Sequence, residues 1–120
     1  MTVQECYAAL EGDYAGVTSR LPSEKFVQKF VLKFVNDGSY DLLLRSMESG
    51  DYSEAFRAAH TIKGVCQNLD CTKLYQSSSA LSEALRNGFT PEAPALAERV
   101  KADYQQTLEA IRAYQASVGL

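Results

Sequence analysis

Apolar residues recur at three- and four-residue intervals along most of the chain, which is the spacing of one face of an α-helix. The most regular stripe comprises Phe26, Val27, Phe30, Val31, Phe34 and Val35. Pro22-Ser23 precedes this stripe and Asp37-Gly38 follows it, so start and stop signals bound a helix on both sides. We expect this segment to be the best core helix of the chain.

Two shorter helices are predicted on either side of that segment. Thr2 and Glu5 have the spacing of a capping box, and Gly12 ends the helix that they begin. Residues 13–20 show no clear period and are expected to form a loop. The other short helix covers residues 39–50, with a serine at its start and a glycine at its end.

Three longer helices follow in the second half of the chain. Asp51 begins the first of them, which reaches Leu69. Either Asp70 or Thr72 can cap the second, which closes at Asn87-Gly88. After a loop with two prolines, the last helix has an apolar stripe formed by Leu96, Val100, Tyr104, Leu108 and Ile111. Short connections imply antiparallel neighbours, so we predict an all-α fold, an up-down antiparallel four-helix bundle with one or two additional short helices.

The single histidine of the chain, His60, lies within the helix predicted after Asp51. With Ile62 as the zero direction and 100° per residue, one apolar stripe falls within roughly 60° of it. The stripe contains Ala55, Ala58, Ala59, Ile62, Val65, Cys66 and Leu69. By the same arithmetic His60 points about 160° away from Ile62, so its ring is predicted to face water. An exposed histidine can be an ordinary surface residue, so the residues around it must indicate whether it has a function.

The neighbours of His60 favour a functional site. Lys63 and Gly64 follow three and four residues later, which places a cation and a bare stretch of backbone one turn from the ring. A glycine inside a helix costs about 1 kcal/mol relative to alanine. Because Gly64 points outward, packing within the chain explains it poorly, and close approach by another molecule explains it better.

Residues 59–64, Ala-His-Thr-Ile-Lys-Gly, followed by Asn68-Leu69, resemble the signature of histidine-containing phosphotransfer (HPt) domains. That signature is Ala-His-x-Leu-Lys-Gly, with Asn-Leu-Gly a few positions later, and a weaker resemblance extends over residues 26–88. The chain departs from it at Val65, where a small polar residue is common, and at Asp70, which replaces a glycine. Asp70 affects the local turn more than the chemistry, because it lies roughly 15 Å along the helix from the histidine.

The resemblance implies a phosphoryl carrier. His60 would accept a phosphoryl group from the aspartyl phosphate of a response-regulator receiver domain and pass it to the aspartate of another receiver, in a multistep two-component phosphorelay. A neutral imidazole is a nucleophile, and we expect attack through Nε2. Lys63 would stabilise charge on the transferring oxygens, so Lys63→Ala should slow transfer without abolishing it. Gly64 would leave room for the partner.

Four further residues are candidates for binding the phosphoryl group or the partner. Gln67 could hydrogen-bond phosphate or could be plain solvated surface. Phe56, Arg57 and Ser53 are expected to form part of the docking surface, although Phe56 could instead fill a helix groove.

Composition limits the other functions. The 120 residues suit one domain, expected over residues 1–120, and contain 46% hydrophobic and 22% charged residues, as ordinary globular chains do. A net charge of -3 argues against nucleic acid as the main partner. No apolar run approaches the roughly 18 to 20 residues that span a bilayer, and the start of the chain lacks the features of a secretory signal. We therefore expect no membrane partner and a cytoplasmic location.

The chain lacks the residues for independent catalysis. It has no phosphate-binding GxxxxGK[ST] loop, and its acidic residues are scattered without the pairing of a hydrolase site. We therefore predict a carrier that is not itself an enzyme and binds no cofactor, with Mg²⁺ coming from the partner receiver domain. A zinc site from His60, Cys66 and Cys71 is not expected, because His60 and Cys66 lie about 120° apart around the helix. Cys66 is instead predicted to be a small buried hydrophobe.

One alternative function stays open at this point. The chain could be an interaction module that docks a receiver domain or a histidine kinase without carrying phosphate, a reading favoured only by Asp70 and Val65. A metal-binding bundle would need several inward ligands, which one outward histidine does not supply. We expect a monomer, although tyrosines on the last helix could either close the core or mediate a dimer.

Overall fold

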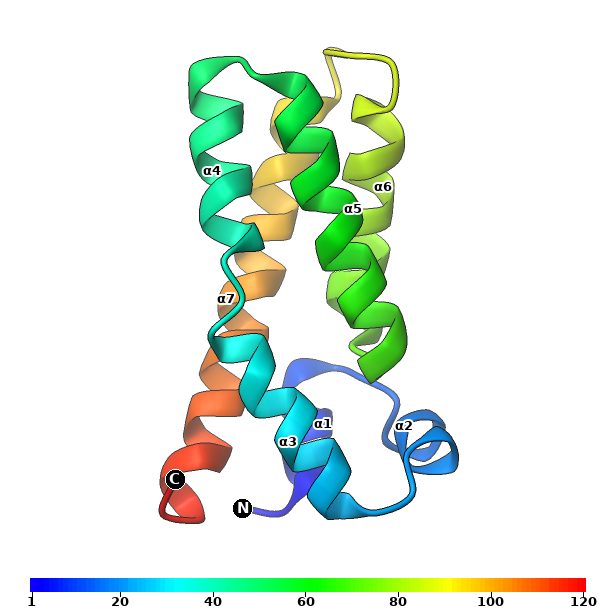
Figure 1. The fold of residues 1–120 in the computed structure, drawn as a ribbon, viewed down its shortest axis with the longest axis vertical. Helices are drawn as coiled ribbons and strands as arrows, with labels where there is room; N and C mark the ends of the chain where they lie inside the picture. The colour runs from blue at the N-terminus through cyan, green and yellow to red at the C-terminus, as the bar shows by residue number, and fades with distance from the viewer.

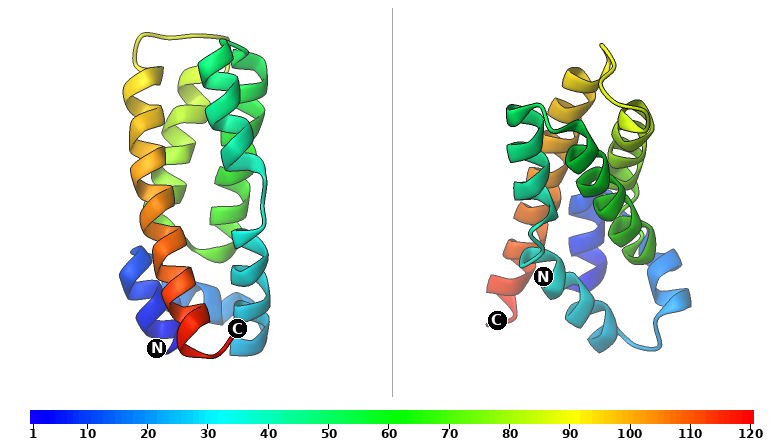
Figure 2. Two further views of the ribbon diagram at one scale, coloured as in Figure 1. Left: turned by 90° about the vertical axis from the view of Figure 1, so that its left-hand side faces the viewer. Right: turned by 45° about the horizontal axis from the view of Figure 1, so that its top comes forward.

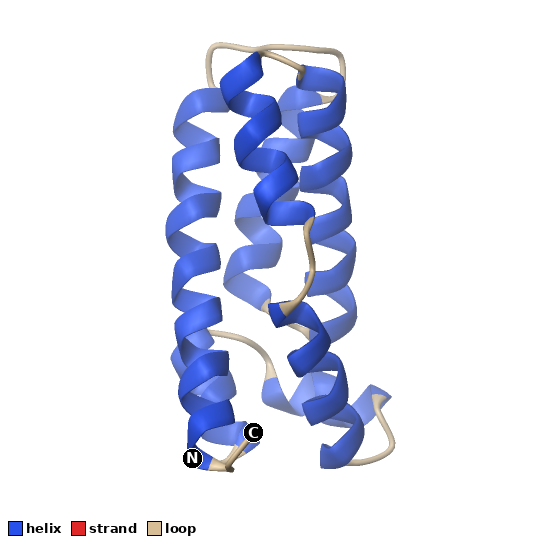
Figure 3. Ribbon diagram, turned by 60° about the vertical axis from the view of Figure 1, so that its left-hand side comes forward, coloured by secondary structure: helices blue, strands red, loops and turns tan.

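The computed structural model describes residues 1–120 as seven α-helices without a strand (Figure 3). The helices are α1 (Val3–Leu10), α2 (Tyr14–Arg20), α3 (Glu24–Val35), α4 (Ser39–Ser49), α5 (Tyr52–Leu69), α6 (Thr72–Leu85) and α7 (Ala93–Ser117). None of them is long and apolar enough to cross a lipid bilayer.

The helices α4, α5, α6 and α7 run alternately up and down as a four-helix bundle (Figure 1). The helix α3 stands below α4 and continues its direction, so these two helices together form one column (Figures 1 and 2). The helices α1 and α2 pack at the lower end, where both chain termini also lie. The predicted all-α up-down bundle is confirmed, with its first column divided into two helices.

Residues 14–20 form the helix α2 with Asp13 as its N-cap, so the loop expected over residues 13–20 is wrong. The Asp13 carboxylate accepts a hydrogen bond from the Gly16 N–H at 3.0 Å and begins the helix. Val17 is fully buried and attaches α2 to the core. A seven-residue helix with one buried side chain has too little apolar period to be recognised from its sequence.

The helix α3 buries less of its apolar stripe than its pattern predicts. Val27, Val31 and Phe34 are buried, whereas Phe26 is 45% exposed and Phe30 is 37% exposed. The reason is position: α3 lies at the lower end of the molecule and touches α7, α5, α1 and α2 only over short stretches, without a helix packed along its length. The expectation that α3 is the best core helix is therefore wrong.

Asp70 ends α5 and does not begin α6. It adopts the left-handed conformation with φ 54°, which aspartate tolerates better than most residues, and Cys71 is the N-cap of α6. Its main-chain carbonyl accepts a hydrogen bond from the Asp13 N–H at 2.8 Å, and its carboxylate pairs with Arg20. Both expected caps of α6 are wrong: these contacts hold Asp70 in the turn, and Thr72 is already the first residue of the helix.

A buried hydrogen bond fixes the same end of α5 from the other side. The Tyr7 hydroxyl donates to the main-chain carbonyl of Leu69 at 2.7 Å. Arg20 also donates to the carbonyls of Gln67 and Asn68, at 2.7 and 3.3 Å. The last carbonyls of α5, which have no partner within the helix, are thus bound by side chains from α1 and α2.

Candidate functional site

The helix α5 separates a buried side from an exposed side. Its buried residues are Ala55, Ala58, Ala59, Ile62, Cys66 and Leu69, and the three alanines let α5 lie close to α4 and α6. His60 is exposed on the opposite side, in agreement with the periodicity. The Asp51 carboxylate accepts from the Glu54 N–H at 3.2 Å and sets the start of the helix.

The His60 ring rests on an aromatic neighbour one turn earlier. The ring centroids of Phe56 and His60 are 5.8 Å apart with an interplanar angle of 28°. The guanidinium carbon of Arg86, from the end of α6, lies 5.5 Å from the Phe56 centroid. Phe56 is half-buried between them, so it both packs against the core and supports the imidazole.

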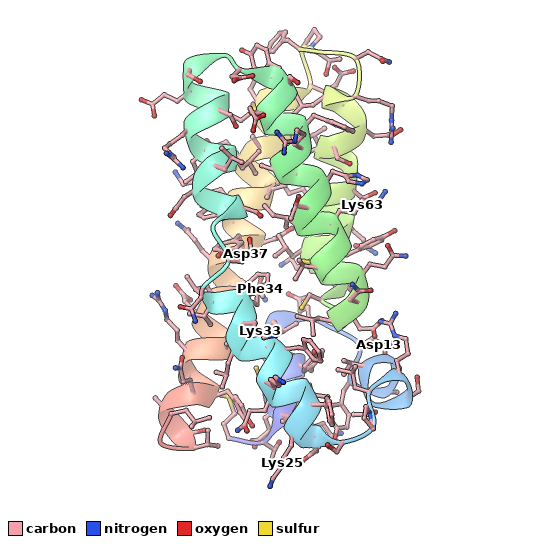
Figure 4. All side chains as sticks on the ribbon, viewed as in Figure 1. Asp13, Lys25, Lys33, Phe34, Asp37 and Lys63 are labelled. Carbon is pink, nitrogen blue, oxygen red and sulfur yellow. The ribbon has the colours of Figure 1, made fainter.

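Positive charge gathers on the α6 side of His60. Lys63 extends from α5 toward α6 (Figure 4). Arg86 donates to Glu83 at 2.9 Å, and this hydrogen bond is the main reason that the pKa of Glu83 is lowered. The charges of Arg86 and Lys63 lower the pKa of Glu83 further. Two cations and one ionised carboxylate therefore lie between α5 and α6 on this side, with Arg86 next to the Phe56 ring on which His60 rests.

Gly64 leaves the surface next to His60 bare. A Cβ atom added at this position would meet no atom within 4 Å. No packing or backbone requirement within the chain therefore calls for glycine here.

The remaining predicted residues lie on the same helix on either side of this centre. Ser53 and Gln67 are exposed, and their separation of fourteen positions corresponds to roughly 21 Å along the helix. Arg57 is held by an ion pair with Glu54 at 2.6 Å. The structure thus places Phe56, Arg57, Lys63 and Gly64 within about one helical turn of His60, and leaves Ser53 and Gln67 farther along the helix.

Sequence reasoning missed the part of the site that comes from α6 and the loop after it. Glu83 and Arg86 belong to this part, and Phe89, which is 52% exposed, lies beyond them at the start of α5. The Phe89 ring lies 5.1 Å from that of Tyr52, between centroids. Helical period places residues on one helix but does not say which residues of another helix lie opposite, so the sequence carried no clear signal for them.

The three cysteines are buried and free. A hydrogen bond with Cys71 and burial raise the pKa of Cys66 well above its ordinary range, and burial raises the pKa of Cys6 to about 11. Cys66 belongs to the core side of α5, as its place in the stripe predicts. It faces away from His60, and no group of three or more metal-ligating residues exists.

Comparison with known proteins identifies the family. The model of the Hpt domain matches residues 36–113, which include α4, α5, α6 and most of α7. Because this match covers more than half of the chain, the protein belongs to the Hpt domain family. No curated protein and no solved structure matches the chain.

Membership places the chain among the phosphotransfer domains of two-component signalling, which are phosphoryl carriers and not classical enzymes. The match begins after α3, so the helices α1, α2 and α3 lie outside it.

Proposed function

We propose that this protein relays a phosphoryl group between the aspartates of receiver domains in a multistep phosphorelay, through a phosphohistidine at His60. The observation that carries the proposal is the exposed imidazole on the Hpt-matched helix α5, with a lysine and an open glycine surface beside it. A reaction partner can reach the ring without any rearrangement of the bundle.

The transfer uses the ring nitrogen farther from the backbone. The lone pair of Nε2 attacks the phosphorus of an aspartyl phosphate, the N–P bond forms, and the P–O bond to the aspartate breaks with its electron pair left on the carboxylate. Transfer to the next receiver runs the same step in reverse. Positioning and electrostatic stabilisation supply most of the catalysis in such reactions.

The neighbours of His60 have distinct parts in this proposal. Phe56 holds the imidazole by stacking, and Arg86 holds Phe56. Lys63 offsets the charge of the phosphoryl oxygens, and Gly64 admits the loops of the receiver. Ser53, Arg57 and Gln67 extend the contact surface.

Magnesium would come from the receiver. The carboxylates nearest the site are already engaged, Glu83 with Arg86 and Glu54 with Arg57. Mg²⁺ needs several oxygen ligands arranged as an octahedron, and these residues do not assemble such a set. The chain's own contribution is the nucleophile and the positive charge around it.

The test is transfer of radiolabelled phosphate from phosphorylated receiver domains to the purified protein and to a His60→Gln variant. We expect acid-labile, base-stable label on the wild type and none on the variant. Circular dichroism checks that both proteins remain equally helical. Label on both proteins would mean that another residue is the acceptor and would overturn the proposal.

The alternative function, a docking module that carries no phosphate, is decided by the same experiment. It requires measurable receiver binding without label on the wild type. The replacement of glycine by Asp70 does not favour it, because Asp70 serves the turn at the end of α5 through its contacts with Arg20 and Asp13.

A further inference from the structure

Two cysteines lie on either side of the turn that ends α5. Cys66 belongs to the last turn of α5, Asp70 is the left-handed residue after the helix, and Cys71 is the N-cap of α6. The Cys71 N–H donates to the main-chain carbonyl of Cys66 at 3.0 Å. This is the hydrogen bond that closes a Schellman turn, in which the side chains of the two bonded residues frequently touch.

The side chains of this pair are in contact inside the core. The thiols of Cys66 and Cys71 are hydrogen-bonded to each other, and the two residues are 0% and 1% exposed. Disulfides usually join residues whose Cα atoms lie about 4.4 to 6.8 Å apart. A main-chain hydrogen bond and a thiol contact hold the pair at such a separation, so an S–S bond can form with the turn as it stands.

The third cysteine of the chain provides an internal comparison. Cys6, on α1, is buried near Cys71. Its thiol donates a hydrogen bond to the main-chain carbonyl of Ala110 on α7 at 3.6 Å, and no main-chain hydrogen bond joins Cys6 to either of the other cysteines. Cys6 therefore has a partner of its own, and the pair across the turn is the one arranged for a disulfide.

A surface pocket of about 380 Å³ gives a small reagent a route to the pair. Cys66 lines this pocket, and in Figure 4 Asp13 marks the side that belongs to the segment before α2. The other lining residues are polar or aromatic: Gln67, Asp70, Thr72 and Tyr75. Buried thiols react slowly when no reagent can reach them, so this approach decides which oxidants are effective, and small ones are favoured.

We propose that Cys66 and Cys71 form a modification site, a dithiol that a small hydroperoxide oxidises to an intramolecular disulfide in the folded protein. One thiolate of the pair attacks a peroxide oxygen, an S–O bond forms, and the O–O bond breaks with release of water or an alcohol. The second thiol attacks the sulfur of this sulfenic acid, the S–S bond forms, and the S–O bond breaks with release of water. The two sulfurs together lose two electrons and two protons, and the hydroperoxide is reduced.

The disulfide joins the end of α5 to the start of α6 by a covalent bond. Cys66 lies on the core side of α5 and His60 on the exposed side, so oxidation leaves the surface around His60 in place. A bond that closes a loop restricts the unfolded chain and thereby stabilises the fold. The modification is thus a lock on the end of α5, and it does not depend on the proposed phosphoryl transfer.

The positions of lysine and arginine make the product easy to identify. Trypsin releases residues 64–73 as one peptide, which contains both cysteines of the pair, and residues 1–20 as another, which contains Cys6. The folded protein is treated with hydrogen peroxide, the remaining thiols are blocked with iodoacetamide in urea, and the peptides are analysed by mass spectrometry. Free glutathione in the same tube shows when the peroxide has acted.

We expect residues 64–73 to become lighter by two hydrogen atoms and to carry no acetamide group, whereas Cys6 is still alkylated. Dithiothreitol should reverse this change, and the oxidised protein should unfold at a higher urea concentration than the reduced one.

Two variants test the assignment. Cys6→Ala is the matched control, because it also removes a buried thiol, and it should form the same disulfide at a rate within about 2-fold of the wild type. Cys71→Ser keeps a residue that suits the N-cap of α6. It should show neither the loss of two hydrogen atoms nor the rise in the urea midpoint.

Three results would overturn the proposal. The first is a disulfide that links residues 1–20 to residues 64–73, because Cys6 would then be the partner. The second is complete alkylation of all three cysteines after the glutathione has been oxidised. The third is a lower urea midpoint in the oxidised wild type, which would mean that the turn has to rearrange to accept the bond.

Discussion

The helices α3 and α5 both carry an apolar stripe, yet they use it differently. In α5 the stripe is almost entirely buried, and the opposite side presents His60 and Gly64. In α3 only half of the stripe is buried, and Phe26 and Phe30 remain at the surface. The difference follows from their neighbours, since α5 lies along both α4 and α6, whereas α3 makes only short contacts with α7, α5, α1 and α2.

The neighbouring helices determine how much of an apolar stripe is buried. The period gives the direction of the core, and the number of neighbouring helices decides how wide a part of the stripe is covered. A helix with surplus apolar residues, such as α3, has surface left for binding. A helix whose stripe is covered except at one residue, as α5 is except at Val65, can devote its polar side to chemistry.

The largest expected effect tests the exposed side of α5. Gly64→Gln should reduce phosphate transfer from a receiver by at least about 100-fold, because a side chain there displaces the partner from the His60 ring. Labelling rates measure this loss. Labelling by phosphoramidate, a small donor that needs no docking surface, provides the control and should change little.

A small side chain at the same position should make the fold more stable. Gly64→Ala should raise the free energy of unfolding by about 1 kcal/mol, since alanine favours the helix and its methyl group meets open space. Urea denaturation measures the change. A lower free energy of unfolding in Gly64→Ala would show that the fold itself needs glycine at this position.

The next effect contrasts two adjacent residues of α3. Val27→Ala should lower the free energy of unfolding by about 2 kcal/mol, because it removes two fully buried methyl groups and leaves a cavity. Phe26→Ala should cost less than about 1 kcal/mol, although it removes a larger side chain, because that side chain is already half in water. Urea denaturation of both variants is the measurement, and equal losses would mean that α3 is more deeply packed than its exposure indicates.

The smallest effect concerns how the two helices are anchored. Tyr7→Phe removes the buried bond to the Leu69 carbonyl of α5 and should cost about 1 kcal/mol at neutral pH. Tyr114→Phe removes the acceptor of Gln28 on α3, in a partly exposed place where water replaces it, and should cost less. Urea denaturation of both variants measures the difference.

The Tyr7 variant should also change the response to alkali. Burial raises the pKa of Tyr7 above its ordinary value of 10.0 and that of Cys6 from 9.0 to about 11. The folded protein therefore keeps protons that the unfolded chain has lost, so this stability is complete below about pH 9 and declines as the pH rises. Unfolding midpoints between about pH 8 and about pH 11 should fall less steeply in Tyr7→Phe than in the wild type. Parallel curves would exclude Tyr7 as a source of the decline.

Much of this architecture could be predicted from the sequence. The helix around His60 was predictable because Asp51 caps it and its small apolar residues keep a strict period. The turn after it was not, because the left-handed Asp70 depends on Arg20, fifty residues earlier in the chain. Glu83 and Arg86 were missed for the same reason: their place near Phe56 and Lys63 comes from the packing of α6 on α5, which no local pattern records.

His60 is the only imidazole in the chain and lies in water on an ordered helix. A nuclear magnetic resonance spectrum of the ring nitrogens therefore contains the signals of one residue, without substitution or selective labelling. Tautomer, protonation, phosphorylation and partner contact would each be followed on that one set of peaks in the unmodified protein. The residue proposed to react is thus also a built-in spectroscopic reporter of its own state.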